Sequence, residues 1–168
     1  MNSSNLKIIK RNGKNYIVIN EILFSGKRNI NWNSVELYLK KYIRKSYVIK
    51  ESGDRIYINS DFPDEYTNSN YSKNSFGAIR KAKANVSQII PELIMYATEI
   101  SYQDNKKEKH NKDAKNGWLR CTVRFVLPIT NDKKQKIGEN YFRARMIIRC
   151  DSNNKKYLYD IIDIKKET

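Results

Sequence analysis

The sequence contains few of the residues on which metal centres and disulfide frameworks depend. Its 168 residues include two cysteines and one histidine, and Cys121 and Cys150 lie 29 positions apart. That spacing matches no zinc-ligand pattern, and the chain carries neither a GxxxxGK[ST] loop nor a GxGxxG loop for phosphate groups. We therefore expect no metal site and no small-molecule cofactor.

Long apolar runs are also lacking. Hydrophobic residues make up 39% of the chain and the mean hydropathy is −0.77. No apolar run approaches the ~20 residues that a membrane-spanning helix needs, and the N-terminal residues show no signal-peptide pattern. These features predict a soluble cytoplasmic protein, without membrane association, whose two cysteines are free thiols.

Acidic residues are scarce relative to basic ones. Lys and Arg number 33 against 18 Asp and Glu, which gives a formal net charge of +15. A protein this basic attracts polyanions, so RNA or another nucleic acid is the expected partner. A lysine-rich bias of the whole genome is the competing explanation, and only the placement of the charges separates the two.

The hydrophobic pattern predicts an α+β protein. Segments 6–22 and 47–59 alternate around Gly-containing turns and predict two β-hairpins, while apolar residues at helical spacing predict an amphipathic helix over 34–44. Residues 1–60 are thus expected to form an N-terminal ββαββ subdomain. The polar segment 61–75 is expected to be a connection.

The remaining residues, 76–168, predict a long helix packed on an antiparallel sheet of three to four strands. Apolar residues keep helical spacing over 76–97, where Pro91 is expected to kink or break the helix. A lysine-rich, exposed connection over 104–117 follows. Three alternating runs then predict an antiparallel meander: 118–127, 141–150 and 157–165.

Strand alternation predicts a basic face on this sheet. Side chains of a strand point alternately to its two faces, and in the first two runs one set is apolar while the other contains five of the ten arginines and no carboxylate. Like charges directly opposite each other on paired strands repel and destabilise the pair, and a bound anion relieves that repulsion.

The chemistry of this face predicts its ligand. Guanidinium groups match phosphate, and aromatic rings stack on unpaired bases, so single-stranded or looped RNA is the expected ligand. The expected nucleic-acid-binding residues are Lys81, Lys83, Trp118, Thr122, Tyr141, Arg143, Arg149, Tyr157 and Lys165. The alternative is an ordinary solvated face on which arginine stems cover apolar neighbours.

Few side chains are suited to acid–base chemistry. Asp160 and Asp163 lie three apart on a predicted strand, which places them on opposite faces and prevents a shared two-carboxylate site. Metal-free cleavage of RNA remains, in which a 2′-hydroxyl attacks the adjacent phosphorus. His110 is the natural proton carrier for this reaction, because its ordinary pKa lies near neutral pH. The alternative is that His110 is a bystander in a lysine-rich loop.

Five segments resemble phage and mobile-element domains of the Barnase-EndoU-colicin-RelE type, a group that includes large polyvalent protein-associated domains and phage nucleases. The segments are 81–94 (KAKANVSQIIPELI), 105–118 (NKKEKHNKDAKNGW), 123–129 (VRFVLPI), 141–149 (YFRARMIIR) and 157–167 (YLYDIIDIKKE). The resemblance spans about residues 55–168. It implies helices followed by a four-stranded antiparallel sheet, and a metal-independent endoribonuclease or toxin. The resemblance favours Lys83 as a functional residue, and the catalytic residues that it implies are His110, Arg120, Arg124, Arg145 and Tyr159.

The sequence thus predicts an endoribonuclease that cleaves RNA by 2′-hydroxyl transesterification. One alternative is a non-catalytic nucleic-acid binder or an inhibitor of a host nucleoprotein, which would need the basic face but not His110. Another is an assembly domain of a mobile element whose charge reflects composition alone. Candidate partners besides RNA are a cognate immunity protein and a host nucleoprotein.

Overall fold

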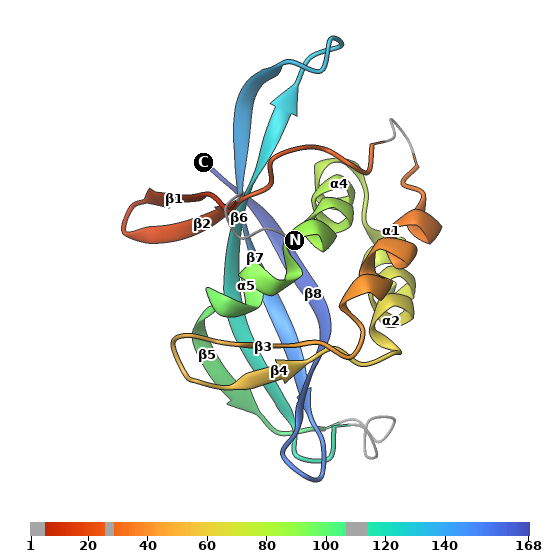
Figure 1. The fold of residues 1–168 in the computed structure, drawn as a ribbon, viewed down its shortest axis with the longest axis vertical. Coiled ribbons are helices and arrows are strands. Elements are labelled where there is room, and N and C mark those ends of the chain that lie inside the picture. The colour runs from red at the N-terminus through yellow and green to blue at the C-terminus, as the bar shows by residue number, and fades with distance from the viewer. Residues whose placement is uncertain (1–5, 26–28, 107–113) are drawn as a thin grey trace.

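The structure is a computed structural model that describes residues 6–25, 29–106 and 114–168. It confirms the α+β class: the strands form one mixed sheet, and α1, α2 and α4 lie together beside β8 (Figure 1). The strands are β1 (Ile8–Arg11), β2 (Lys14–Val18), β3 (Ser46–Val48), β4 (Arg55–Tyr57), β5 (Thr98–Gln103), β6 (Trp118–Thr130), β7 (Lys136–Cys150) and β8 (Lys156–Glu167). The helices are α1 (Trp32–Leu39), α2 (Phe62–Asn68), α3 (Asn70–Asn74), α4 (Gly77–Asn85) and α5 (Ile90–Met95), with 3-10 turns at Lys40–Tyr42 and Val86–Ile89.

The meander of β6, β7 and β8 confirms the three C-terminal strands. The inner residues of β6 and β7 alternate as expected, and Phe125 lies opposite Phe142 with stacked rings 5.2 Å apart. The far ends of both strands project as a hairpin beyond the rest of the molecule (Figure 1). Three shorter strands pair directly with these long strands: β2 and β5 with β6, and β4 with β8.

The sheet is larger than expected, so the prediction of three to four antiparallel strands was wrong. Among the described residues it contains eight strands: seven follow the order β1-β2-β6-β7-β8-β4-β3, and β5 pairs with β6 outside this path. The two N-terminal hairpins form as expected but join this sheet, because β2 pairs in parallel with β6 and β4 in parallel with β8. An isolated two-stranded hairpin is marginally stable in water, and joining a larger sheet buries its apolar face. The described part of residues 1–60 therefore shares one sheet and one core cluster with the C-terminal part.

Segment 61–75 forms two helices instead of the expected polar connection. Phe62 and Tyr66 of α2 are fully buried, and the Tyr66 hydroxyl donates to the Lys83 carbonyl over 2.5 Å. The Ser69 side chain caps α3 by accepting from the backbone N–H of Ser72. Two aromatic residues four apart, which share one helix face, therefore outweigh the polar composition of the segment.

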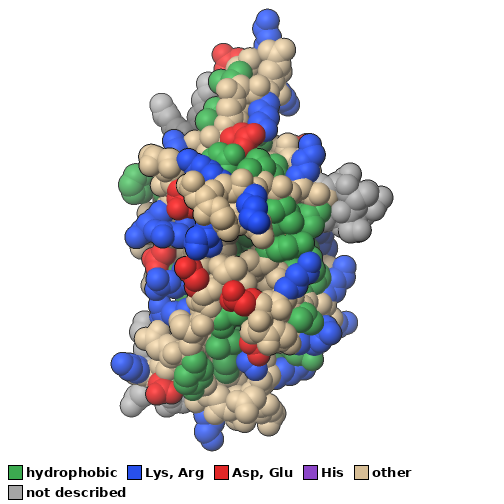
Figure 2. All heavy atoms as spheres, turned by 90° about the vertical axis from the view of Figure 1, so that its left-hand side faces the viewer, with side chains coloured by type: hydrophobic (Ala, Val, Ile, Leu, Met, Phe, Trp, Pro, Cys, Tyr) green, Lys and Arg blue, Asp and Glu red, His purple; other side chains and the backbone are tan. Residues whose placement is uncertain are grey.

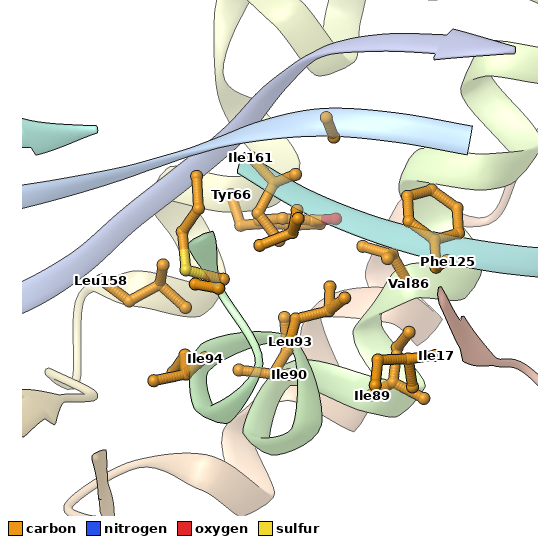
Figure 3. Packing of buried hydrophobic residues seen from close by; sticks show 14 of the residues in the cluster. Ile17, Tyr66, Val86, Ile89, Ile90, Leu93, Ile94, Phe125, Leu158 and Ile161 are labelled. Carbon is orange, nitrogen blue, oxygen red and sulfur yellow. The ribbon is translucent and has the colours of Figure 1, made fainter. Parts of the chain in front are cut away.

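The long helix expected over 76–97 is divided, as Pro91 suggested. Helix α4 ends at Asn85, a 3-10 turn follows, and Pro91 lies in the first turn of α5. A proline is tolerated there because the first backbone N–H groups of a helix have no partner within it. The core lies between these segments and the sheet: Ile90 and Leu93 of α5 point toward the strands that carry Phe125 and Leu158 (Figure 3).

Two irregularities in β8 change which of its side chains reach the core. The β7–β8 register shifts twice, and each shift inserts one extra residue into β8. The core residues of β8 are therefore three apart: Leu158, Ile161 and Ile164. Strict alternation along this strand would place Ile162 inside and Ile161 outside, and the two extra residues reverse that arrangement.

The same irregularities bring the two β8 aspartates to one face. Asp160 lies opposite Ile147, and Asp163 is in the left-handed region with φ 53°. Both aspartates line pockets together with outward-facing residues of β6 and β7, so the prediction that they lie on opposite faces was wrong.

Both cysteines are free, as expected, and both are buried. None of the helices in the described ranges has the length and apolarity required to cross a bilayer.

Candidate nucleic-acid interface

The side of the β6–β7–β8 meander that does not carry the core is called here the outer face. Its β6 and β7 residues alternate with the buried core residues, as the sequence predicted. Over 118–127 and 141–150 they are Trp118, Arg120, Thr122, Arg124, Val126, Tyr141, Arg143, Arg145, Ile147 and Arg149. All five predicted arginines therefore share one face of two adjacent strands.

Three cations form a row across the outer face. Arg124 lies directly opposite Arg143, and Arg143 lies opposite Lys165 of β8. Arg124 is only 9% exposed; its Nη1 donates to the Thr98 hydroxyl over 3.2 Å, and its Nη2 lies 3.5 Å from Glu99 Oε2. Arg143 and Lys165 are exposed, and neither lies within ion-pair distance of a carboxylate of the described chain. The row is thus neutralised at one end only.

A polar pocket of about 260 Å³ opens beside this row, and we call it the arginine pocket. Arg143, Arg145 and Lys165 supply three positive charges to its lining, against one carboxylate each from Glu99 and Asp163. Arg145 Nη1 lies 3.9 Å from Asp163 Oδ2. A hydrogen bond from Thr122 and the charge of Arg124 hold the Glu99 pKa below its ordinary value. The surplus of positive charge suits a bound anion.

A second, more apolar pocket of about 380 Å³ lies on the same face, and we call it the aromatic pocket. The rings of Trp118 and Tyr159 meet edge to face with their centroids 5.1 Å apart, and Ile147 and Ile162 add apolar walls. Its polar lining comes from Arg120, Asp160, the last residue of β5 and the three residues that follow it: Gln103, Asp104, Asn105 and Lys106. Apolar walls with a few polar groups are typical of a site for a flat ring.

A buried ion pair lies behind the aromatic pocket. The ammonium of Lys83, on α4, donates to Asp160 and, over 2.6 Å, to the carbonyl of Ile161, and it lies 3.7 Å from the centre of the Tyr66 ring. Burial lowers the Lys83 pKa to about 8 and raises that of Asp160, although each partner's charge opposes the shift of the other. Lys83 is fully enclosed, so it positions Asp160 rather than presenting a charge to phosphate.

Other predicted residues lie at the margins of the outer face. Tyr141 packs edge to face against Tyr16, and the Arg11 guanidinium lies 4.4 Å from the centre of the Tyr141 ring. Arg149 is buried, with its guanidinium 4.9 Å from the centre of the Tyr157 ring.

Two further predicted residues are not among those that line the outer-face pockets. Lys81 is half-buried on α4 and lines neither pocket. His110 lies outside the described residues, so its expected catalytic role stays a prediction.

Sequence reasoning missed the contribution of β5 to this face. Glu99 and Gln103 belong to β5 or its end, in a segment that no strand was expected to occupy. Its alternating pattern, TEISYQ, was the available signal. The side of the molecule on which β5 lies shows Asp and Glu interspersed with Lys and Arg over its whole height (Figure 2). The absence of carboxylates over 118–127 and 141–150 therefore does not describe the whole basic surface, and β7 itself carries Glu139 beyond this range.

Comparison of the chain with models of protein families, with curated proteins and with solved structures found no match. The interface is therefore interpreted from its own geometry and charge.

Proposed function

We propose that this protein binds single-stranded RNA on the outer face. A phosphate group would occupy the arginine pocket, and an unpaired base would enter the aromatic pocket. The observation that carries this proposal is the row of Arg124, Arg143 and Lys165 across three neighbouring strands, with only one end neutralised.

Electrostatics supports a phosphate ligand. Like charges directly opposite each other destabilise a strand pair, and a bound polyanion converts this repulsion into attraction. Arg143 and Arg145 offer planar donor groups that match phosphate oxygens in pairs. The overall charge of +15 favours approach of any polyanion, while these two side chains supply a defined contact.

The aromatic pocket supports an unpaired base rather than a duplex. Thr122 lines the arginine pocket and Arg120 the aromatic pocket, so the two sites are two residues, or about 7 Å, apart along β6. Trp118 and Tyr159 can contact a base only when that base is free of its stack. A chain whose bases are unpaired can therefore fill both pockets at once.

The test is fluorescence anisotropy with a labelled single-stranded RNA over a series of salt concentrations. The double variant Arg143→Ala/Lys165→Ala should weaken binding and lower the salt slope by about 1.4, because each phosphate contact on a single strand contributes about 0.7. Trp118→Ala should weaken binding by roughly 5- to 150-fold, the equivalent of about 1–3 kcal/mol for one stacked base, without changing that slope.

The control is the double variant Lys73→Ala/Lys133→Ala, which removes the same charge from exposed positions on α3 and the β6–β7 loop. If it reduces affinity and slope as much as the Arg143/Lys165 variant does, binding reflects net charge and the proposed interface is wrong. A duplex of equal length that binds as tightly as the single strand would contradict the role of the aromatic pocket.

A second candidate is metal-independent cleavage of the bound RNA. The favouring observation is that Arg120 and Asp160 line the aromatic pocket together with Lys106, the last described residue before the segment that carries His110. In this reaction the 2′-oxygen would attack phosphorus as a base removes its proton. The bond to the 5′-oxygen would break as that oxygen accepts a proton, leaving a 2′,3′-cyclic phosphate and a free 5′-hydroxyl.

Cleavage is tested by incubating RNA with the protein in EDTA. The wild type should produce cyclic-phosphate ends, whereas His110→Ala and Arg120→Ala should not. The matching DNA should stay intact because it lacks the attacking hydroxyl. Intact RNA after incubation with protein that binds it would leave binding as the function of the outer face.

A further inference from the structure

A third cavity, of about 400 Å³, lies between the 3-10 turn that follows α1, strand β3 and helix α5. It shares no lining residue with the arginine pocket or the aromatic pocket. Its walls are largely apolar and include Leu6, Pro91 and Met95. This volume and lining are in the range of small-molecule sites.

A buried carboxylate without a partner lines this cavity. Glu92 is 3% exposed, and neither of its carboxylate oxygens has a hydrogen-bond partner among the described residues. Burial raises the Glu92 pKa, and the nearby backbone N–H of Glu92 itself and the charge of Lys41 offset this only in part. Buried carboxylates in folded proteins nearly always have donors, because an unpaired one loses its hydration without compensation. The missing donor therefore points to a ligand.

The neighbouring side chains do not supply that donor. The single O–H of Tyr42 donates to the Ser87 carbonyl over 2.8 Å. The ammonium of Lys41 lies 3.9 Å from the centre of the Tyr38 ring and 5.3 Å from that of Tyr42. The ammonium of Lys41 therefore lies against aromatic rings, and only the second of these rings, that of Tyr42, lines the cavity.

The charges around the cavity restrict the ligand. The Glu92 carboxylate would attract a simple cation, but Lys41 and Lys45, which both line the cavity, would repel it. The two lysines would attract a simple anion, but the buried carboxylate would repel it. A ligand with both kinds of group satisfies all three side chains.

We propose that this cavity binds a small zwitterion, an α-amino acid with an apolar side chain. Its ammonium group donates to the Glu92 carboxylate, its own carboxylate lies near Lys41 and Lys45, and its side chain contacts Leu6, Pro91 and Met95. This site is independent of the outer face and does not rest on RNA binding.

The test is isothermal titration calorimetry of the full chain with leucine, methionine and phenylalanine. Two blocked compounds separate the charges: N-acetyl-leucine lacks the ammonium group, and leucinamide lacks the carboxylate and resembles the N-terminus of a peptide. At least one free amino acid should bind, and each blocked form of leucine should bind about tenfold more weakly than leucine or worse.

The variant Glu92→Gln keeps the size of the side chain and should also weaken amino-acid binding about tenfold or more, while RNA binding stays unchanged. Glu51→Gln, on the exposed turn after β3, removes the same charge and should bind the amino acid like the wild type. Absence of binding by any of the three amino acids would overturn the proposal. Equal binding of N-acetyl-leucine or leucinamide, or unchanged amino-acid binding by Glu92→Gln, would do the same.

Discussion

The buried pair of Lys83 and Asp160 joins α4 to β8, and Lys83→Met is the substitution that tests its role. Methionine approximates the shape of the lysine stem but carries no charge. The change leaves Asp160 buried without its cation and removes the side-chain donor to the Ile161 carbonyl. Both effects act in the same direction, toward a lower free energy of unfolding.

The expected loss follows from the burial of the two side chains, which are 0% and 6% exposed. Removal of one partner from a buried ion pair costs about 3–5 kcal/mol, because the remaining charge stays dehydrated. For a chain of this length that loss lowers the melting temperature by roughly 6–20 °C. A pair exposed on the surface would lose about 1 kcal/mol or less.

The assay is urea denaturation of the wild type, Lys83→Met, Asp160→Asn and the double variant. The amide oxygen introduced by Asp160→Asn would still accept the hydrogen bond from the backbone N–H of Ile161. The double variant should therefore regain about 2 kcal/mol or more relative to the sum of the two single losses. A single loss below about 1 kcal/mol, or strictly additive losses, would refute the reasoning.

The same pair predicts a pH dependence. Burial lowers the Lys83 pKa from 10.5 to about 8, so between these values the folded state binds fewer protons than the unfolded chain. The free energy of unfolding contributed by this group therefore rises with pH across the window and is lost as the pH falls through about 8. The stability difference between wild type and Lys83→Met should grow between pH 8 and 10.5. A difference that is constant over this window would show that Lys83 is not desolvated.

Three further predictions concern other buried groups. Asn85→Ala should lower the free energy of unfolding by roughly 2–4 kcal/mol in urea, because the Asn85 side chain accepts from and donates to the backbone of Phe24 at 3.1 and 2.9 Å. Gly117→Ala should cost about 1–3 kcal/mol more than Gly53→Ala by the same measurement: both glycines have positive φ, but an added Cβ lies 2.5 Å from a main-chain oxygen of β5 only at Gly117. Equal costs would contradict this close approach. Burial raises the Cys121 pKa to about 12, so its thiol should react with a thiol reagent only after unfolding, and rapid reaction in native protein would contradict that burial.

The three C-terminal strands were predictable because their signal is local. Alternation in 118–127 and 141–150 identifies both the core residues and the arginine-bearing face, and the opposition of Arg124 and Arg143 follows once the two strands pair. The α+β class and the two N-terminal hairpins likewise depend on patterns within a few residues of each other. Helix α2 carried a signal of the same kind in Phe62 and Tyr66, but the polar composition around them obscured it.

The joining of the hairpins to one sheet was not predictable from these patterns. The pairing of β2 with β6 joins residues more than 100 positions apart, and no local preference specifies such a partner. The two extra residues in β8 are a further example, because strict alternation cannot show where a strand is bulged. These irregularities brought Asp160 and Asp163 to the outer face.

The sequence by itself determined which strands would carry arginines, because side-chain alternation is a property of each strand alone. Only the tertiary structure decided how these arginines and the other charged side chains are compensated. Glu99 reaches Arg124 from β5, and Lys83 reaches Asp160 from a helix 77 residues away in the chain. Ion pairing depends on distance in space, and that distance is set by packing rather than by position along the chain.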